Sequence, residues 1–173
     1  PKFDENKEDV EWLAKLVGLM YKKGCTEDPL YFTASEARYE LDPSPAAAFD
    51  LGKAFYKAEN YSDAINYLKI AAEGLEDDLE RADAYLVLAN SYKNTSQFSN
   101  ARTAALSCIG LDAKNGKAYI LIGDMYAATA GSCGDNEVTQ RAGYWAAADK
   151  YAKAKSVSED EKVIDIATQK YNG

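Results

Sequence analysis

Histidine is absent from this 173-residue chain, and cysteine and proline are scarce, with three and four residues respectively. Without histidine, the Cys–His and Ser–His pairs that activate many nucleophiles cannot form. The cysteines lack the paired spacing of a zinc site, and no glycine-rich phosphate-binding run is present. Carboxylates cluster at 76–78 and 159–161, where we expect solvated turns rather than a catalytic pocket. We therefore expect a protein that is not an enzyme and that holds no cofactor and no metal.

Positive charge is also in short supply, with 20 Lys and Arg against 28 Asp and Glu and a formal net charge of −8. An acidic surface gains nothing from the counterion release that drives binding to nucleic acids, and anionic membranes repel it. No run of about 18 apolar residues occurs, so we expect no membrane insertion and no nucleic-acid partner. Because the chain begins at Pro1, we expect a processed or shortened form. The absence of a signal peptide from such a form does not show whether the protein is exported.

Large and small apolar residues alternate at helical spacing between Pro45 and Asp78. The pattern predicts two amphipathic helices, at about 46–57 and 62–73, joined by a short polar turn. At Gly52 and Ala64, a side chain larger than a methyl group would hold the two antiparallel helices apart. This unit resembles the tetratricopeptide (TPR) repeat, a helix-turn-helix of about 34 residues. The resemblance implies a binding scaffold but does not identify its ligand.

The same pattern recurs along the chain, so we expect one all-α domain that covers residues 1–173. By resemblance it is a right-handed superhelix of about 3.5 TPR-like repeats with a C-terminal capping helix. The expected units are a degenerate repeat at 7–44, repeats at 45–78, 82–115 and 116–155, and a capping helix at 159–171. Asp4 or Asn6 is the expected cap of the first helix, and Ser158 that of the last, in a capping box with Glu161. The last helix also fits an alternative, the first helix of a further repeat.

An insertion interrupts the third clear repeat at residues 130–143, where a standard unit has a short turn. The small, polar, glycine-rich run 130–136 predicts a loop, and 137–141 is compatible with an extra helical turn capped by Asn136. Two interpretations stay open, a tolerated decoration and a functional loop. Ser132-Cys133-Gly134 followed by Tyr144-Trp145 resembles a subgroup of exported bacterial TPR proteins without an assigned activity, which implies an extracytoplasmic location.

The cysteines are expected to stay reduced. Cys108 falls at a small-residue position of a helix, where a buried, inert thiol is the expectation. Cys25 and Cys133 fall in expected loops, and a disulfide would need their Cα atoms within about 7 Å. Because three stacked repeats separate the two loops, we expect no such bond.

The TPR resemblance also implies a concave groove lined by the first helix of each repeat. Residues that flank the packing stripe of these helices would point into it. They are Phe49, Lys53, Tyr56 and Lys57 in the first clear repeat, Leu86, Asn90, Lys93 and Asn94 in the second, and Lys117, Ile120 and Asp124 in the third. Lysine exceeds acid in this set, and asparagine amides can both donate to and accept from a peptide backbone.

One known TPR function is not expected here. Chaperone-binding TPR proteins hold a C-terminal carboxylate with a clamp of Lys, Asn and Arg at fixed first-helix positions. The corresponding positions in this chain are Phe49, Lys53, Val87, Lys117 and Leu121. Only Lys117 matches the clamp.

The resulting hypothesis is a non-catalytic scaffold whose groove binds a segment of a protein or peptide. The alternatives are a component of extracytoplasmic glycan handling, with a sugar over Phe49 or Tyr56, and an N-terminal scaffold fragment of a larger protein whose activity lies elsewhere.

Overall fold

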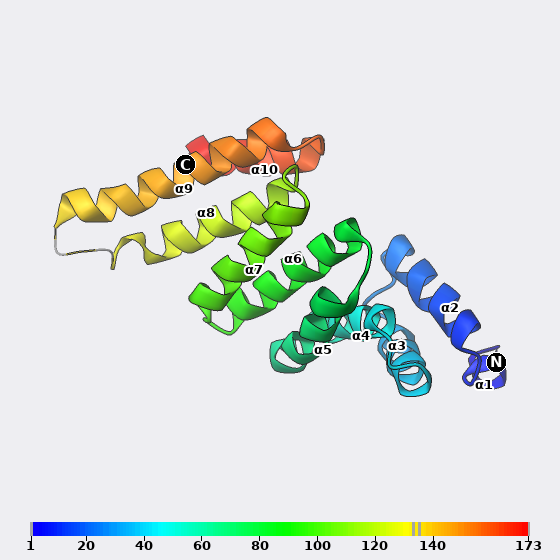
Figure 1. The fold of residues 1–173 in the computed structure, drawn as a ribbon. Helices are drawn as coiled ribbons and strands as arrows, with labels where there is room; N and C mark the ends of the chain where they lie inside the picture. Colours follow the sequence, from blue (N-terminus) through cyan, green and yellow to red (C-terminus); the bar gives the residue numbers. More distant parts are fainter. Residues whose placement is uncertain (1, 133, 135, 173) are drawn as a thin grey trace.

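The computed structural model describes residues 2–132, 134 and 136–172, and this part of the chain contains ten helices and no strand. The helices are α1 (Lys2–Asn6), α2 (Val10–Lys23), α3 (Pro29–Leu41), α4 (Pro45–Lys57), α5 (Tyr61–Gly74), α6 (Asp78–Asn94), α7 (Phe98–Leu111), α8 (Gly116–Ala130), α9 (Glu137–Val157) and α10 (Glu161–Asn172). They follow one another in an elongated array with the two termini at opposite ends (Figure 1). The predicted all-α solenoid is confirmed.

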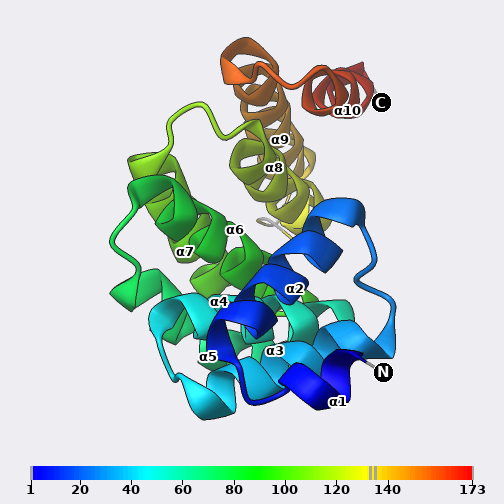
Figure 2. The ribbon, with the colours of Figure 1, turned by 90° about the vertical axis from the view of Figure 1, so that its right-hand side faces the viewer.

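Alternate helices form two layers (Figures 1 and 2). The even-numbered helices α2, α4, α6, α8 and α10 each contact the next member of that series, as well as their neighbours in sequence. Within the described residues, no comparable contact joins α3 to α5, α5 to α7 or α7 to α9. The even-numbered helices are therefore closer together and form the inner, concave layer of a curved stack. This layer holds the groove that the sequence predicts.

Short polar side chains begin most of these helices. Asp28 accepts a hydrogen bond from the backbone N–H of Leu30 at 2.9 Å, and Ser44 accepts one from Ala47 at 3.3 Å. Pro29 and Pro45 follow these caps, at a helical position where a backbone N–H has no partner within the helix. Each such cap contributes about 1 kcal/mol, so the helix starts are encoded locally.

Small residues allow the paired helices to approach closely. A Cβ atom at Gly52 would lie 2.8 Å from Cγ of Leu68 on α5, and one at Gly123 would lie 2.5 Å from Cε1 of Tyr151 on α9. The close approach expected at Gly52 is confirmed. Aromatic rings fill the wider gaps, as where Phe55 stacks on Tyr67 with ring centroids 5.3 Å apart.

Two helix starts differ from the expectation. Helix α2 begins at Val10 because the Asp9 carboxylate accepts from the N–H of Trp12, so neither Asp4 nor Asn6 caps it. Helix α6 begins at Asp78 because Asp77 accepts from the N–H groups of Leu79 and Glu80, both at 2.9 Å. Residues 79–81, expected between two repeats, are therefore the first turn of α6.

The insertion at 130–143 is mostly helical. Helix α8 extends to Ala130, and Asn136 starts α9 in a capping box with Thr139. The extra turn expected at 137–141 is the beginning of a continuous helix that reaches Val157, so only residues 131–136 connect the two helices (Figure 1). Residues 133 and 135 of this connection lie outside the described residues.

The capping box expected at Ser158 is wrong. Asp160 accepts from the N–H of Lys162 at 2.9 Å at the start of α10, whereas the Ser158 hydroxyl accepts from the N–H of Asp160. Helix α10 packs on α9 and α8, as α8 packs on α7 and α6. It therefore occupies the position of a first helix in the inner layer, where its side chains contribute to the concave surface.

Candidate functional site

A cavity of about 420 Å³ lies on the concave surface between α6, α8 and α10. Six of the eleven predicted groove residues line it, three from α6 and three from α8. They are Leu86, Asn90 and Lys93 from α6, and Lys117, Ile120 and Asp124 from α8. The structure thus brings all the predicted residues of these two repeats except Asn94 into one site.

The helix α10 and the residue before it form the third wall of this cavity. They contribute Asp160, Lys162, Val163 and Ile166, none of which belongs to the predicted set. The sequence signal was present, because Val163 and Ile166 lie on the apolar stripe of the last helix. The predicted groove set ended at the third repeat and did not extend to the alternative in which the last helix is the first helix of a further repeat, the position that α10 occupies.

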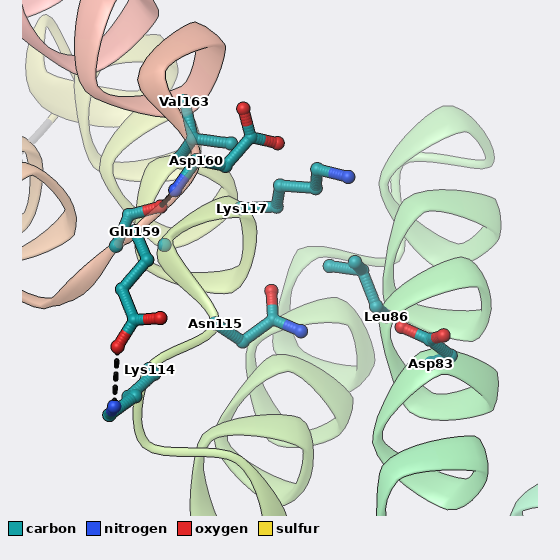
Figure 3. A pocket seen from close by; sticks show the side chains of 10 residues that line it. Asp83, Leu86, Lys114, Asn115, Lys117, Glu159, Asp160 and Val163 are labelled. Carbon is teal, nitrogen blue, oxygen red and sulfur yellow. Dashed lines mark hydrogen bonds and ion pairs between the residues drawn. The ribbon is translucent and has the colours of Figure 1, made fainter.

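A second hollow of about 230 Å³ continues the cavity along the start of α8 (Figure 3). The two share Leu86, Lys117, Asp160 and Val163. Figure 3 shows Leu86 and Asp83 on α6 facing Asn115 and Lys117 across the opening. The combined hollow is therefore elongated and takes its lining from three helices.

Apolar side chains form the floor of the cavity. Ile120, Leu121 and Val163 are buried, and Leu86 is half-buried, while Ile166 is 45% exposed on α10. At the side of this floor, the Asn90 amide donates to the backbone oxygen of Leu86 at 2.9 Å. One N–H and the carbonyl oxygen of Asn90 are left for other partners.

Among the acidic groups that line the cavity, only Asp124 has an ion-pair partner in the described residues. Asp124 accepts from Nζ of Lys170 at 2.8 Å and from the Tyr151 hydroxyl at 2.9 Å. Burial raises the pKa of Tyr151, and so does its hydrogen bond to Asp124. Desolvation raises the pKa of Asp83, and the positive charge of Lys117 opposes that shift.

Three of the basic groups at the cavity are also without an ion pair among the described residues. Lys93, Lys117 and Lys162 form no ion pair within 4.0 Å in the described part of the chain. Lys114, at the outer edge, pairs with Glu159 at 2.6 Å (Figure 3). That hydrogen bond raises the pKa of Lys114 and lowers the pKa of Glu159. The cavity therefore presents three ammonium groups to solvent.

The predicted groove residues on α4 are in a different environment. Lys53 is only 9% exposed, and its Nζ lies 2.9 Å from Asp50, which also binds Arg38 of α3. The same ammonium lies 4.3 Å from the ring centroid of Tyr21 on α2 and 4.2 Å from that of Phe49. The charge of Lys53 is thus engaged inside the protein.

The remaining predicted residues lie outside the cavity. Tyr56 is half-buried and packs edge-on against Tyr61, with centroids 5.6 Å apart. Lys57 and Asn94 are exposed at the C-terminal ends of α4 and α6.

Cysteine chemistry does not contribute to the site. Burial raises the pKa of Cys108 to about 12, so its thiol is protonated at neutral pH, as expected of a buried residue. Cys25 is exposed, and the question of a Cys25–Cys133 bond falls on Cys133, which lies outside the described residues. In the part of the chain that the structure covers, no three Cys, Asp or Glu side chains are grouped as metal ligands would be. No described helix combines the length and apolar character of a membrane span.

No protein-family model and no curated protein matches the chain. Among solved structures, two crystal structures of MamA match it with TM-scores of 0.66 and 0.68 at 24% and 23% sequence identity. These matches cover 87% and 89% of this chain, and 83% and 75% of the MamA chains. The structure of the MamA RS-1 ArsTM double mutant matches with a TM-score of 0.68 at 19% identity, over 90% of this chain and 78% of its own.

The fold is TPR-like. At these identities the similarity to MamA concerns the fold, a solenoid of paired helices. The positions of the groove residues come from the chain itself.

Proposed function

We propose that the protein is a non-catalytic scaffold that binds a segment of a partner protein in the concave cavity between α6, α8 and α10. The observation that carries this proposal is the convergence of six predicted groove residues and the inner face of α10 on one cavity. The TPR-like fold supports the general role, since stacked helical repeats create the extended concave surfaces with which such proteins bind partners.

The physical character of the cavity suits this role. Its volume of about 420 Å³ falls within the range of roughly 300 to 1,000 Å³ that is usual for binding pockets. An apolar floor with a few polar groups at its edge is the arrangement that receives the apolar face of a helix or an extended segment. Burying the partly exposed Leu86 and Ile166 would supply affinity, and Asn90 would orient the bound backbone.

The glycan alternative gains no support at the residues that suggested it. Stacking of a sugar needs a free aromatic face, and Lys53 lies over the ring of Phe49. Tyr56 is half-buried beside Tyr61. The protein-binding function therefore remains the better supported one.

Site-specific photo-crosslinking in cells of the source organism tests the proposal. A photoreactive phenylalanine replaces Ile166 at the cavity, and in a matched control it replaces Ile70, which is 41% exposed on α5. We expect crosslinks from position 166 to map to one short segment of one partner, and no such adduct from position 70. Identical adducts from both positions, or none from position 166, would contradict the proposal.

A further inference from the structure

We propose that the segment held by the concave cavity is acidic and amphipathic, with Asp or Glu side chains on either side of large apolar ones. This inference rests on the proposed function and specifies its partner. It follows from a contrast between the cavity and the chain as a whole, whose formal net charge is −8.

The charged side chains that line the cavity differ in whether an ion pair within the protein already engages them. Lys93, Lys117 and Lys162 come from three different helices and surround the floor, and none has a partner within 4.0 Å among the described residues. Of the two carboxylates that line the cavity, only Asp124 is in an ion pair in the described part of the chain. Asp124 binds Lys170 and Tyr151, and Asp160 caps the first turn of α10. Among the described residues, the cavity therefore presents three unpaired ammonium groups against one unpaired carboxylate, that of Asp160, and Asp83 adds a second such carboxylate in the continuation beside Lys117.

This arrangement does not follow from the general behaviour of inner-layer lysines in the molecule. Lys53 also lies on the inner layer, at a different position of α4, but Asp50 and two aromatic rings enclose it. Lys170 is likewise bound by Asp124. Three ammonium groups from three helices, unpaired in the described part of the chain, thus surround the cavity, and an acidic ligand would be complementary to them.

The apolar floor and the shape of the hollow define the rest of the ligand. Carboxylates alone would leave Leu86 and Ile166 uncovered, so the ligand needs apolar side chains between its acids. The continuation toward Lys114 and Asn115 makes the hollow elongated, which suits a chain segment. The free amide groups of Asn90 can bind a backbone N–H and C=O, which a protein segment offers and a fatty acid does not.

Selection from a displayed library of randomised peptides tests this chemistry without assuming a particular partner. The protein is the bait, beside a triple variant Lys93→Gln/Lys117→Gln/Lys162→Gln. A control triple variant, Lys22→Gln/Lys69→Gln/Lys153→Gln, changes the net charge equally at exposed positions outside the cavity. Far-UV circular dichroism verifies that each variant is folded.

We expect the enriched peptides to combine Asp or Glu with large apolar residues. Three lost charge contacts at the edge of the site should weaken their binding roughly tenfold in the cavity variant, and the control variant should bind as the parent does. Replacing the acids of a selected peptide by Asn and Gln should weaken binding to the parent protein by a similar factor. This replacement is a sharper test than added salt, which would also screen the repulsion by the acidic remainder of the chain.

Two results would overturn the inference, and only the second would also contradict the proposed function. Peptides without an acidic preference that lose binding on Ile166→Ala, but keep it on Ile70→Ala, would show that the cavity binds segments of another chemistry. In that case the proposed function stands. If no enriched peptide depends on Ile166, both the acidic partner and the function of the cavity are wrong.

Discussion

The two halves of the concave surface hold their inward-facing lysines in different ways. On α4, the lysine that faces inward is held by Asp50 and enclosed by Tyr21 and Phe49. On α6 and α8, Lys93 and Lys117 have no ion-pair partner among the described residues and border a cavity. The repeat pattern therefore determines which way a side chain points, while the neighbouring helix determines whether its charge is available.

Lys53 is enclosed and the lysines at the cavity are not because different helices cover the two halves of the concave surface. Helix α2 contacts α4 and brings Tyr21 over Lys53, and Arg38 from α3 completes the cluster around Asp50. At the other end, α10 contacts α8 but leaves about 420 Å³ open toward α6. Under the proposed function, the cluster around Asp50 stabilises the N-terminal half and the cavity of the C-terminal half binds the partner, a division that the following substitutions test.

The largest effect is expected from Asp50→Ala. Asp50 lies between Arg38 and Lys53, and its side chain is only 12% exposed, so its removal leaves two adjacent cations poorly solvated. We expect a loss of about 3 kcal/mol in the free energy of unfolding, measured by urea denaturation followed by circular dichroism. The control is Asp78→Ala, which breaks an exposed pair with Arg81 and should cost less than about 1 kcal/mol. Equal losses in the two variants would show that the cluster is not a stabilising feature of the N-terminal half.

Gly123→Ala should have the next largest effect and perturbs the C-terminal half. The new Cβ would lie 2.5 Å from the Tyr151 ring, whose hydroxyl is held by Asp124, so α8 and α9 must move apart. We expect a loss of about 2 kcal/mol in urea denaturation, as is typical of overpacking. Gly18→Ala in α2 is the matched control, since a Cβ there would meet no atom of another helix within 4 Å, and it should stabilise the protein by about 0.5 to 1 kcal/mol. Destabilisation by both variants would point to helix geometry rather than to the α8–α9 contact.

Replacing Lys53 or Lys117 singly tests whether the first lysine stabilises the fold and the second binds the ligand. Lys53→Gln removes an ion pair and two cation–π contacts and should lower the free energy of unfolding by about 1 to 2 kcal/mol. Lys117→Gln should change it by less than about 0.5 kcal/mol, because Lys117 is exposed and forms no ion pair in the described residues. The effects on binding of a selected acidic peptide should have the opposite order. Fluorescence anisotropy should show weaker binding by the Lys117→Gln variant and unchanged binding by the Lys53→Gln variant. Weaker binding for Lys53→Gln at unchanged stability would contradict the assigned roles.

The sequence supports prediction of the helices and of the direction of their side chains, because both follow from local pattern. Alternating large and small residues around Gly52 indicate paired helices, and caps such as Asp28 mark their starts. The enclosure of Lys53 was not predictable, since it depends on Tyr21 and Arg38, which are distant in sequence and reach Lys53 and Asp50 only in the folded stack. The contribution of Ile166 was missed for a related reason, because a capping helix and an inner-layer helix have the same amphipathic pattern.

The smallest effect on stability is expected at the mouth of the cavity, where Lys114 and Glu159 pair across exposed loops (Figure 3). The lowered pKa of Glu159 means that any stabilisation exists above the ordinary pKa of a glutamate and is lost as the pH falls through the lowered value. Both groups are solvated, so Lys114→Gln should leave the melting temperature at neutral pH unchanged.

The same variant should nevertheless return the pKa of Glu159 toward its ordinary value, which an NMR titration of its side-chain carboxyl group measures. A change in melting temperature as large as that of Asp50→Ala would show that this pair holds α8 and α10 together. The mouth of the cavity would then be a structural junction, as the cluster around Asp50 is, and the division between a stabilising and a binding half would fail.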